Sequence, residues 1–170
     1  FGGYAGPKAD YGYDSHRFAA NEPFDGDVAQ KLGGVPIHGC PKLIGHSDAD
    51  VLTHALMDAL LGAAALGDIG KLFPDNDDRF LGADSIQLLR EVCRVLGEKD
   101  YRICNVDCTV LAQRPKLAPH IPAMRENLSE AMGLPLDCVS VKATTEEGLG
   151  FTGEGLGIAA HAVALIEKTK

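Results

Sequence analysis

His46-Ser47-Asp48-Ala49-Asp50-Val51-Leu52-Thr53-His54 opens the stretch that decides the fold, and it predicts a helix over about residues 48–66. Ser47 followed by Asp50 resembles a capping box, and leucines and alanines then recur at helical spacing on one face. On the opposite side of the helix, Asp50, His54 and Asp58 form one stripe, each a turn from the last. Because charged groups are costly to bury unless they are paired or bind something, this stripe predicts a partly buried site.

The composition of the 170-residue chain indicates one globular domain and narrows its partners. Hydrophobic residues make up 45% and charged residues 24%, which are ordinary globular values. The net charge of −8 argues against nucleic acid as a partner, because nucleic acid demands a basic surface. No apolar run approaches the ~20 residues of a membrane span. Five scattered cysteines predict neither a zinc knuckle nor a disulfide framework.

The other segments predict strands interleaved with helices. Residues 1–10 are expected to be a disordered terminus or an expression remnant, which places the domain at residues 11–170. Helices besides the first are expected at about 83–98 and 119–132, and strands at 11–18, 31–37 (weakly, with a turn), 103–112, 139–144 and 158–166. A mobile glycine-rich loop is expected at 148–155. This order predicts an α/β (α+β) single domain, a mixed sheet with helices on one face, whose open face an oligomer could cover.

Asp14-x-His16 together with His54 forms a candidate metal site. A strand presents residues i and i+2 on one side, and the helix brings His54 to them. Two imidazoles and one carboxylate suit zinc, with a fourth position open. The alternative is a surface Asp-x-His pair and a core histidine satisfied by hydrogen bonds. Asp50 and Asp58 are either hydrogen-bond partners of His54 or plain acids of the helix face.

Other polar residues stand where phosphate or hydroxyl groups could bind. His46-Ser47 lies at the expected helix N-terminus, which attracts phosphate, although Ser47 could equally be a plain cap. Residues 144–147 follow a strand, where hydroxyls and a carboxylate could meet phosphate and Mg²⁺. Three aspartates in loops suit hydroxyls or Mg²⁺, or are simply solvated: Asp68, Asp75 and Asp77.

Several spaced strings occur in a fixed order: Gly12-Tyr13-Asp14-Ser15-His16, His46-Ser47-Asp48-Ala49-Asp50, Asp68-Ile69-Gly70-Lys71-Leu72-Phe73-Pro74-Asp75, Arg114-Pro115-Lys116, Pro119-His120, Lys142-Ala143-Thr144-Thr145 and Gly150-Phe151-Thr152-Gly153. With them the chain, from about Tyr11 onward, resembles the 2-C-methyl-D-erythritol 2,4-cyclodiphosphate synthase family of the non-mevalonate isoprenoid pathway. The resemblance implies a CMP-releasing phosphorus–oxygen lyase acting on 4-diphosphocytidyl-2-C-methyl-D-erythritol 2-phosphate. In that reaction the 2-phosphate attacks the β-phosphate, a metal-assisted intramolecular phosphoryl transfer that closes the cyclic diphosphate.

The resemblance also implies roles for individual residues. Asp14, His16 and His54 match zinc ligands, and Glu147 matches the ligand of a Mg²⁺ or Mn²⁺ that bridges the phosphates. His46 and Thr145 match catalytic residues that stabilise the transition state. The expected substrate contacts are Asp14, Ser15, His16, His46, Ser47, Asp68, Ile69, Gly70, Phe73, Pro74, Asp75, Asn76, Asp77, Ala112, Gln113, Arg114, Pro115, Lys116, Leu117, Ala118, Thr144, Thr145, Glu146, Glu147 and Phe151.

Within that set, the resemblance assigns Asp68 and Gly70 to the ribose, Asp75 to the methylerythritol hydroxyls, and residues 112–118 with Thr144 to a cytosine pocket from a neighbouring subunit. The implied assembly is a homotrimer with active sites at subunit interfaces and sheets facing its interior. Its partner is the small-molecule cytidine diphosphate substrate, with no nucleic acid and no membrane. A bacterial cytoplasmic location is expected in preference to a plastid stroma.

One departure from the family pattern concerns regulation. Many members carry an arginine after Gly-Phe-Thr-Gly, near a central trimer cavity proposed to hold isoprenoid diphosphates, whereas this chain has Glu154. Because a carboxylate repels a diphosphate, we expect that ligand to bind weakly or not at all. Two other functions remain open from the sequence: a zinc-dependent phosphohydrolase that uses water as nucleophile, and a trimeric nucleotide-binding module without turnover.

Overall fold

The computed structural model describes residues 2–170, and the part of the expected disordered terminus that falls on Phe1 lies outside the described residues. The strands are β1 Lys8–Arg17, β2 Ala29–Leu32, β3 Val35–His38, β4 Tyr101–Leu111, β5 Val139–Thr144 and β6 Gly157–Lys168. The α-helices are α1 Val51–Ala63, α2 Ile69–Leu72, α3 Ser85–Glu98, α4 Ile121–Met132 and α5 Gly150–Gly153. Short 3₁₀ turns lie at Asp78–Phe80, Ala118–His120 and Leu136–Cys138.

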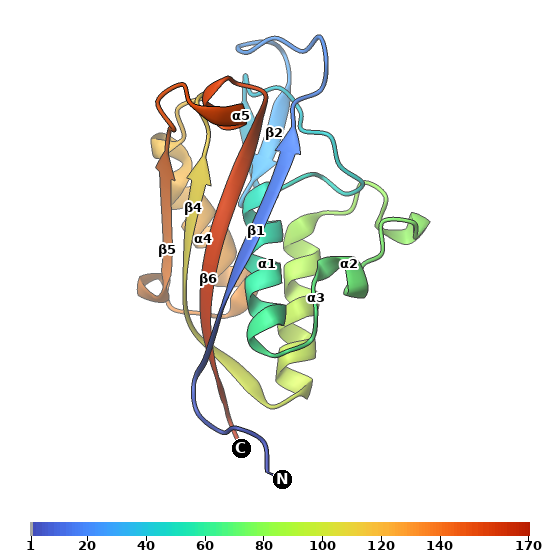
Figure 1. Ribbon diagram of the computed structural model, residues 1–170, viewed down its shortest axis with the longest axis vertical. Helices are drawn as coiled ribbons and strands as arrows, with labels where there is room; N and C mark the ends of the chain where they lie inside the picture. The colour runs from blue at the N-terminus through green and yellow to red at the C-terminus, as the bar shows by residue number, and fades with distance from the viewer. Residues whose placement is uncertain (1) are drawn as a thin grey trace.

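Four of the strands form one mixed sheet in the order β1-β6-β4-β5. The β4–β5 pair is parallel, and the β1–β6 and β4–β6 pairs are antiparallel. Helices α1, α3 and α4 all lie on the same side of this sheet (Figure 1). One continuous hydrophobic core fills the space between the layers. The predicted fold class, a single-domain mixed sheet with helices on one face, is therefore confirmed.

β1 begins earlier than the sequence indicates. The strand was expected from residue 11, but Lys8 already pairs with Ile166, and the register continues to Arg17 opposite Gly157. The expectation that residues 8–10 are disordered is therefore wrong. Its composition makes this stretch a poor strand by itself, and the long β6 supplies the partner that orders it.

The weak strand expected at residues 31–37 is a hairpin of two strands, β2 and β3. Gly33 and Gly34 form the turn with φ values of 57° and 73°, a combination that suits the two-residue turn of a hairpin. Pro36 lies in β3 of this two-stranded sheet, where a missing backbone N–H is tolerated.

Helix α1 is shorter than expected and more deeply buried. It begins at Val51 with Asp50 as its N-cap, because the Asp50 carboxylate accepts from the Thr53 N–H at 3.1 Å. The expected capping role of Ser47 is wrong. Nearly the whole helix surface is buried, since α1 lies between the sheet on one side and α3 on the other. The polar stripe predicted from the wheel is thus enclosed in the protein.

A glycine in β1 allows the strand and α1 to come close. A Cβ atom at Gly12 would lie 1.9 Å from the carbonyl oxygen of Ala55 and 2.7 Å from the amide nitrogen of Ala59. Only a residue without a side chain permits this approach. It matters for the site because Asp14 and His16 follow on the same helix-facing side of β1, as their spacing predicts.

The remaining elements follow the expectations within a few residues, except for the short helix α2, which was not expected, and for residues 148–155. The expected loop there contains the helical turn α5. Thr152 lies inside it and is buried, and its hydroxyl donates to the Glu146 carboxylate at 2.5 Å. A tertiary contact therefore orders a segment whose glycine content predicts a loop.

The face of the sheet opposite the helices carries exposed aromatic and aliphatic side chains. Tyr11, Tyr13 and Val163 remain 52%, 42% and 50% exposed. His161 lies among them, with its Nδ1 2.5 Å from the Tyr11 hydroxyl and its ring edge-on to Tyr13. Within residues 2–170, none of the helices is long and apolar enough to cross a membrane.

Candidate active site

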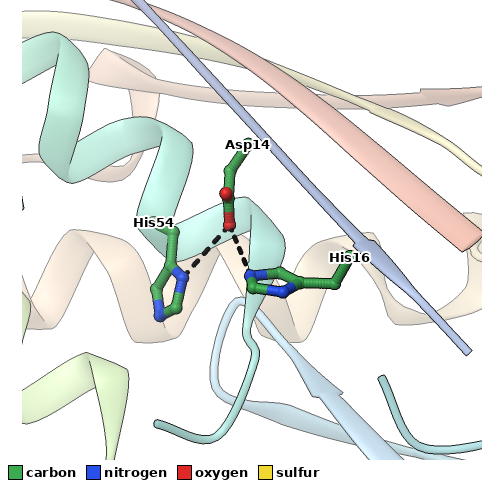
Figure 2. A group of neighbouring side chains, drawn as sticks. All are labelled: Asp14, His16 and His54. Atoms are coloured by element: carbon green, nitrogen blue, oxygen red, sulfur yellow. Dashed lines mark hydrogen bonds and ion pairs between the residues drawn. The ribbon is translucent and has the colours of Figure 1, made fainter. Parts of the chain in front are cut away.

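Asp14, His16 and His54 meet where β1 passes the first turns of α1 (Figure 2). Asp14 Oδ2 lies 2.9 Å from His16 Nε2 and 3.1 Å from His54 Nδ1. One ligand atom from each residue lies within 4.8 Å of the others. The three residues that the Asp-x-His spacing and the helical histidine predicted are therefore together in one site.

The protonation of His16 shows what this cluster is suited to bind. His16 Nδ1 lies 2.8 Å from the Ile44 carbonyl oxygen, so this nitrogen carries a proton and donates it. The buried Nε2 meets no hydrogen-bond donor among residues 2–170 and faces the carboxylate of Asp14. Two groups with lone pairs at 2.9 Å require a cation between them, either a proton or a metal ion.

Charge and burial act in opposite directions on this pair. Burial works to raise the pKa of Asp14, but its contacts with His16 and His54 outweigh burial and lower it. Burial also opposes the charged form of His16, yet the Asp14 carboxylate raises the pKa of His16 overall. The metal-free pair therefore favours an imidazolium–carboxylate contact, and a divalent cation would take the place of that proton.

His54 is held by hydroxyl groups, which the sequence interpretation missed. Its Nε2 lies 2.8 Å from Ser85 Oγ and 3.0 Å from Ser47 Oγ. Ser85 also contacts the carboxylate of Asp48. The sequence pattern indicates phosphate binding or capping for Ser47, and Ser85 stands at the start of a predicted helix, so no local pattern ties either residue to His54.

The two acids of the helical stripe do not serve His54. Asp50 is fully buried and accepts from the N–H groups of Gly33 at 2.9 Å and Gly34 at 2.8 Å. Asp58 accepts from the Ile69 N–H at 2.8 Å. Their predicted role as partners of a zinc-ligand ring nitrogen is therefore wrong, because backbone donors from the hairpin turn and from α2 occupy them.

Burial raises the pKa of both of these carboxyl groups. For Asp50 the nearby Asp48 charge acts in the same direction, and three backbone N–H groups oppose it. For Asp58 the Ile69 N–H opposes burial. The two acids thus fix the turn after β2 and the start of α2 in place around the metal cluster.

A cavity of about 290 Å³ opens beside the metal cluster. His46 belongs to it, with its Nε2 3.0 Å from the Asp77 carbonyl oxygen. Nine predicted residues line it: Asp14, His16, His46, Ser47, His54, Ile69, Gly70, Phe73 and Asp75. Two further lining residues, Phe80 and Leu88, were not predicted. The two missed residues are apolar and gave no sequence signal beyond ordinary core positions.

Four other predicted residues lie near this cavity without lining it. Asp68 caps α2 by accepting from the Lys71 N–H at 2.9 Å. The Asp77 carboxylate is turned to Arg79, which donates to it at 2.7 Å. Pro74 and Asn76 belong to the same loop between α2 and the turn at Asp78–Phe80. Capping and ion pairing therefore occupy two of the acids that the sequence offered as ligands.

A second group of predicted residues forms a separate cavity of about 520 Å³. It lies at the ends of β4 and β5, and Thr145, predicted to be catalytic, belongs to it. Its lining is Ala112, Gln113, Arg114, Pro115, Lys116, Leu117, Ala118, Ala143, Thr144 and Thr145. The predicted cytosine segment and Thr144 are thus brought together, but away from the metal cluster.

Three more predicted residues do not line the triad's cavity. Ser15 and Phe151 line a third cavity of about 530 Å³ between the end of β1 and α5, and His16 of the triad also lines it. Glu147 is exposed, and its N–H donates to Thr145 Oγ1 at 3.3 Å. In a single chain, the predicted ligand of the second metal therefore stands with Thr145 and not with His54.

Sheet order separates the two halves of the predicted site. Asp14 and His16 lie on edge strand β1, whereas Thr144 ends edge strand β5 and Thr145 follows it, and two strands run between these edges. With strands ~4.8 Å apart, the edges are about 14 Å from each other. Figure 1 shows β1 with α1 and α2 on one flank and β5 on the other.

Comparison with known proteins gives consistent matches over nearly the whole chain. A family model described as the YgbB family matches residues 8–167. The 2-C-methyl-D-erythritol 2,4-cyclodiphosphate synthase of Clostridium perfringens is 57% identical over 157 residues, 92% of this chain and 97% of that protein.

Two solved structures are also similar. The Plasmodium falciparum IspF in a CDP complex has a TM-score of 0.84 at 33% identity, covering 99% of this chain and 100% of that one. The bifunctional IspDF from Campylobacter jejuni has a TM-score of 0.89 at 38% identity. The match covers 98% of this chain but 44% of that protein, so this chain corresponds to less than half of the bifunctional one.

Proposed function

Because the chain belongs to the YgbB family, and its curated relatives are 2-C-methyl-D-erythritol 2,4-cyclodiphosphate synthases, we propose that Asp14, His16 and His54 hold the metal on which its reaction depends. The chain is a lyase-type enzyme that forms the cyclodiphosphate in the non-mevalonate isoprenoid pathway. The observation that carries the proposal is the buried His16 Nε2, which faces the Asp14 carboxylate without a donor from residues 2–170.

Zinc suits this donor set of two imidazoles and one carboxylate. When bound, it would neutralise phosphate charge and act as a Lewis acid. The remaining work is positioning, since phosphoryl transfer within one molecule needs its 2-phosphate oxygen aligned with the β-phosphorus while the bond to CMP breaks. The shape and the donors of the cavity beside the triad would supply that alignment.

His46 and Ser47 are the residues that we assign to the phosphates in this cavity. His46 Nε2 donates to the Asp77 carbonyl, which orients the ring and leaves Nδ1 free to face a ligand. Ser47 Oγ lies 3.0 Å from His54 Nε2, directly beside the metal cluster. We assign the ribose to Asp68 and Gly70.

We propose that the second half of the site comes from a neighbouring copy of the chain in a homotrimer. Residues 112–118 with Thr144 would hold the cytosine, and Thr145 would act on the transition state. Glu147 would hold a Mg²⁺ or Mn²⁺ ion, which would neutralise phosphate charge. The separation of β1 and β5 on opposite sheet edges supports this arrangement, because neighbouring subunits can bring such edges together. The exposed face around Tyr13 and Val163 would then face the trimer interior.

One similar solved structure supports the proposed substrate, and the organisms of two relatives support the proposed compartment. The Plasmodium falciparum protein binds CDP in its solved structure, which agrees with a cytidine diphosphate substrate here. The curated relatives from Clostridium perfringens and Thioalkalivibrio sulfidiphilus are bacterial, and we extend the proposal to a bacterial cytoplasmic enzyme.

Phosphorus NMR of the reaction with 4-diphosphocytidyl-2-C-methyl-D-erythritol 2-phosphate tests the proposed function. We expect a cyclic diphosphate and CMP from the wild type, and loss of at least 100-fold in turnover from His54→Ala or after chelation of the metal. Restoration by added zinc should follow chelation of the wild type but not His54→Ala. Ser129→Ala, in α4 and away from the triad, is the control.

Other outcomes of the same experiment point to other functions. Open-chain monophosphate or inorganic phosphate would indicate a phosphohydrolase that uses the same triad. CMP binding without turnover, or full activity in His54→Ala, would indicate a nucleotide-binding module. Either result would overturn the metal-dependent cyclisation proposed here.

A further inference from the structure

A chain of buried hydrogen bonds leads from His54 away from the cavity. Ser85 Oγ lies 2.8 Å from His54 Nε2 and also bonds Asp48 Oδ1. Asp48 Oδ2 accepts from the Ser85 backbone N–H at 2.9 Å. Ser85 is completely buried and His54 is 7% exposed. Neither Asp48 nor Ser85 is among the residues that line the cavity, so the roles assigned above do not account for them.

The directions of these hydrogen bonds follow from counting protons. A carboxylate only accepts, so the one hydroxyl proton of Ser85 goes to Asp48. Ser85 Oγ can then only accept from His54, which places the ring proton on Nε2. A neutral imidazole with its proton on Nε2 has its lone pair on Nδ1. That atom is the one that lies 3.1 Å from Asp14 Oδ2, inside the metal cluster.

We propose that Ser85 and Asp48 are positioning residues that fix the tautomer and the ring orientation of His54, so that Nδ1 is presented to the metal. Histidine ligands commonly donate their second ring N–H to an oxygen acceptor, which orients the ring and raises its basicity. Here Asp48 Oδ1 is 4.0 Å from His54 Nε2, too far for a direct hydrogen bond, and the Ser85 hydroxyl bridges the gap.

The proposal rests on the metal centre proposed above, and a purely structural role is the competing explanation. Asp48 N–H donates to the Ala83 carbonyl at 3.1 Å, and Gly82 N–H donates to the His46 carbonyl at 2.8 Å. These bonds join the segment before α1 to the start of α3 whether or not His54 is involved. The test therefore needs readings that do not depend on stability.

Nitrogen NMR of the metal-free wild type gives the first reading without any variant. Long-range ¹⁵N–¹H correlation of histidine-labelled protein separates the two neutral tautomers, and the His54→Ala spectrum identifies the His54 signals. We expect His54 with its proton on Nε2. A proton on Nδ1, or an even mixture of the two tautomers, would overturn the proposal even if the protein bound no zinc.

Zinc affinity, measured by competition with a chromophoric chelator, gives the second reading. We expect Ser85→Ala to bind zinc 10–100-fold more weakly than the wild type, the range typical for loss of such a partner. Ser129→Ala is the matched control, since Ser129 lies in α4, away from the metal cluster, and its Oγ donates to the Leu134 carbonyl. It should lower thermal stability modestly and leave zinc affinity unchanged. Equal zinc affinity in Ser85→Ala and the wild type would refute the proposal.

Asp48→Asn provides a second variant with nearly the same shape. Both Asp48 oxygens accept from protein donors, so an amide at this place puts one N–H group against another or turns the Ser85 hydroxyl toward His54. We expect weaker zinc binding and a shift of the His54 proton toward Nδ1. A wild type that binds no zinc would instead refute the metal centre, and the tautomer reading would still decide the role of Ser85.

Discussion

Asp14 is the central residue of the proposed metal site, because both histidines approach the same oxygen of its carboxylate. In the metal-free protein a proton shared with His16 satisfies that oxygen. The raised pKa of His16 and the lowered pKa of Asp14 express this contact. Binding of a metal must therefore release a proton.

The sign of the resulting pH dependence follows from the two shifts. The contribution of His16 to metal-free stability is present at low pH and is lost as pH rises through its raised pKa. That of Asp14 is present above its ordinary pKa and is lost as pH falls through the lowered one. Protons therefore compete with metal most strongly in the acid range below the pKa of His16.

We predict that zinc affinity rises about tenfold for each unit of pH below the pKa of His16 and then levels off, because one proton is displaced. Chelator competition from pH 5 to pH 8 measures this. An affinity that stays constant over the whole range would contradict the proton-bridged contact between Asp14 and His16.

At the level of elements, the site depends on how β1, α1 and α2 are held together. Gly12 sets the distance between β1 and α1, and Asp58 ties the first residue of α2 to α1. The two contacts differ in kind, since the first is a close approach that leaves no room for a side chain and the second is a hydrogen bond. Their loss should accordingly appear in different measurements.

Gly12→Ala is expected to destabilise the protein by about 3 kcal/mol or more. The Cβ of the new alanine would collide with backbone atoms of α1, which cannot move aside as a flexible side chain can. Chemical denaturation measures the loss. Gly97→Ala is the control: Gly97 lies in α3, is exposed, and a Cβ there meets nothing within 4 Å. That variant should gain about 0.5–1 kcal/mol. Equal stability of the two variants would contradict the close approach of β1 and α1.

Asp58→Ala should weaken CMP binding about 5-fold, equivalent to ~1 kcal/mol, since the Ile69 N–H loses its acceptor and the start of α2 loosens. Isothermal titration calorimetry with CMP measures this. Asp58→Asn keeps an oxygen acceptor and should bind CMP as the wild type does. If both variants bind equally weakly, the charge of Asp58 is responsible and not its hydrogen bond to α2.

At the level of the whole molecule, one chain offers two half-sites that do not face each other. The metal cluster lies at the β1 edge and the cavity with Thr145 lies at the β5 edge of the same sheet. A ring of identical chains brings unlike edges together at every interface. The proposed trimer therefore makes a quantitative prediction about mixed assemblies.

Co-expression of His54→Ala with Thr145→Ala should restore activity that neither variant has alone. If each site takes its metal half and its Thr145 half from different chains, random mixing gives intact sites in about a quarter of cases. Turnover of the mixture, compared with each variant purified separately, measures this. No recovery in mixed oligomers would mean that both halves act within one chain, and a monomer in analytical ultracentrifugation would also contradict the proposal.

The sequence by itself determined the mixed sheet, its strands and helices within a few residues, and the Asp14–His16–His54 cluster. The strands and helices depend on local periodicity, which sequence patterns report directly. The cluster follows from the Asp-x-His spacing, the helical histidine and the resemblance to a family. Through the resemblance to a family, the sequence also assigned the cytosine pocket and the metal triad to different subunits.

Only the tertiary structure decided what the buried polar groups do. Asp50 and Asp58 share a helix face with His54, but backbone N–H groups from the turn after β2 and from α2 claim them. His54 instead meets Ser85, 31 residues away. A buried donor or acceptor takes whichever partner the packed chain brings within reach, and spacing along a helix does not determine that choice.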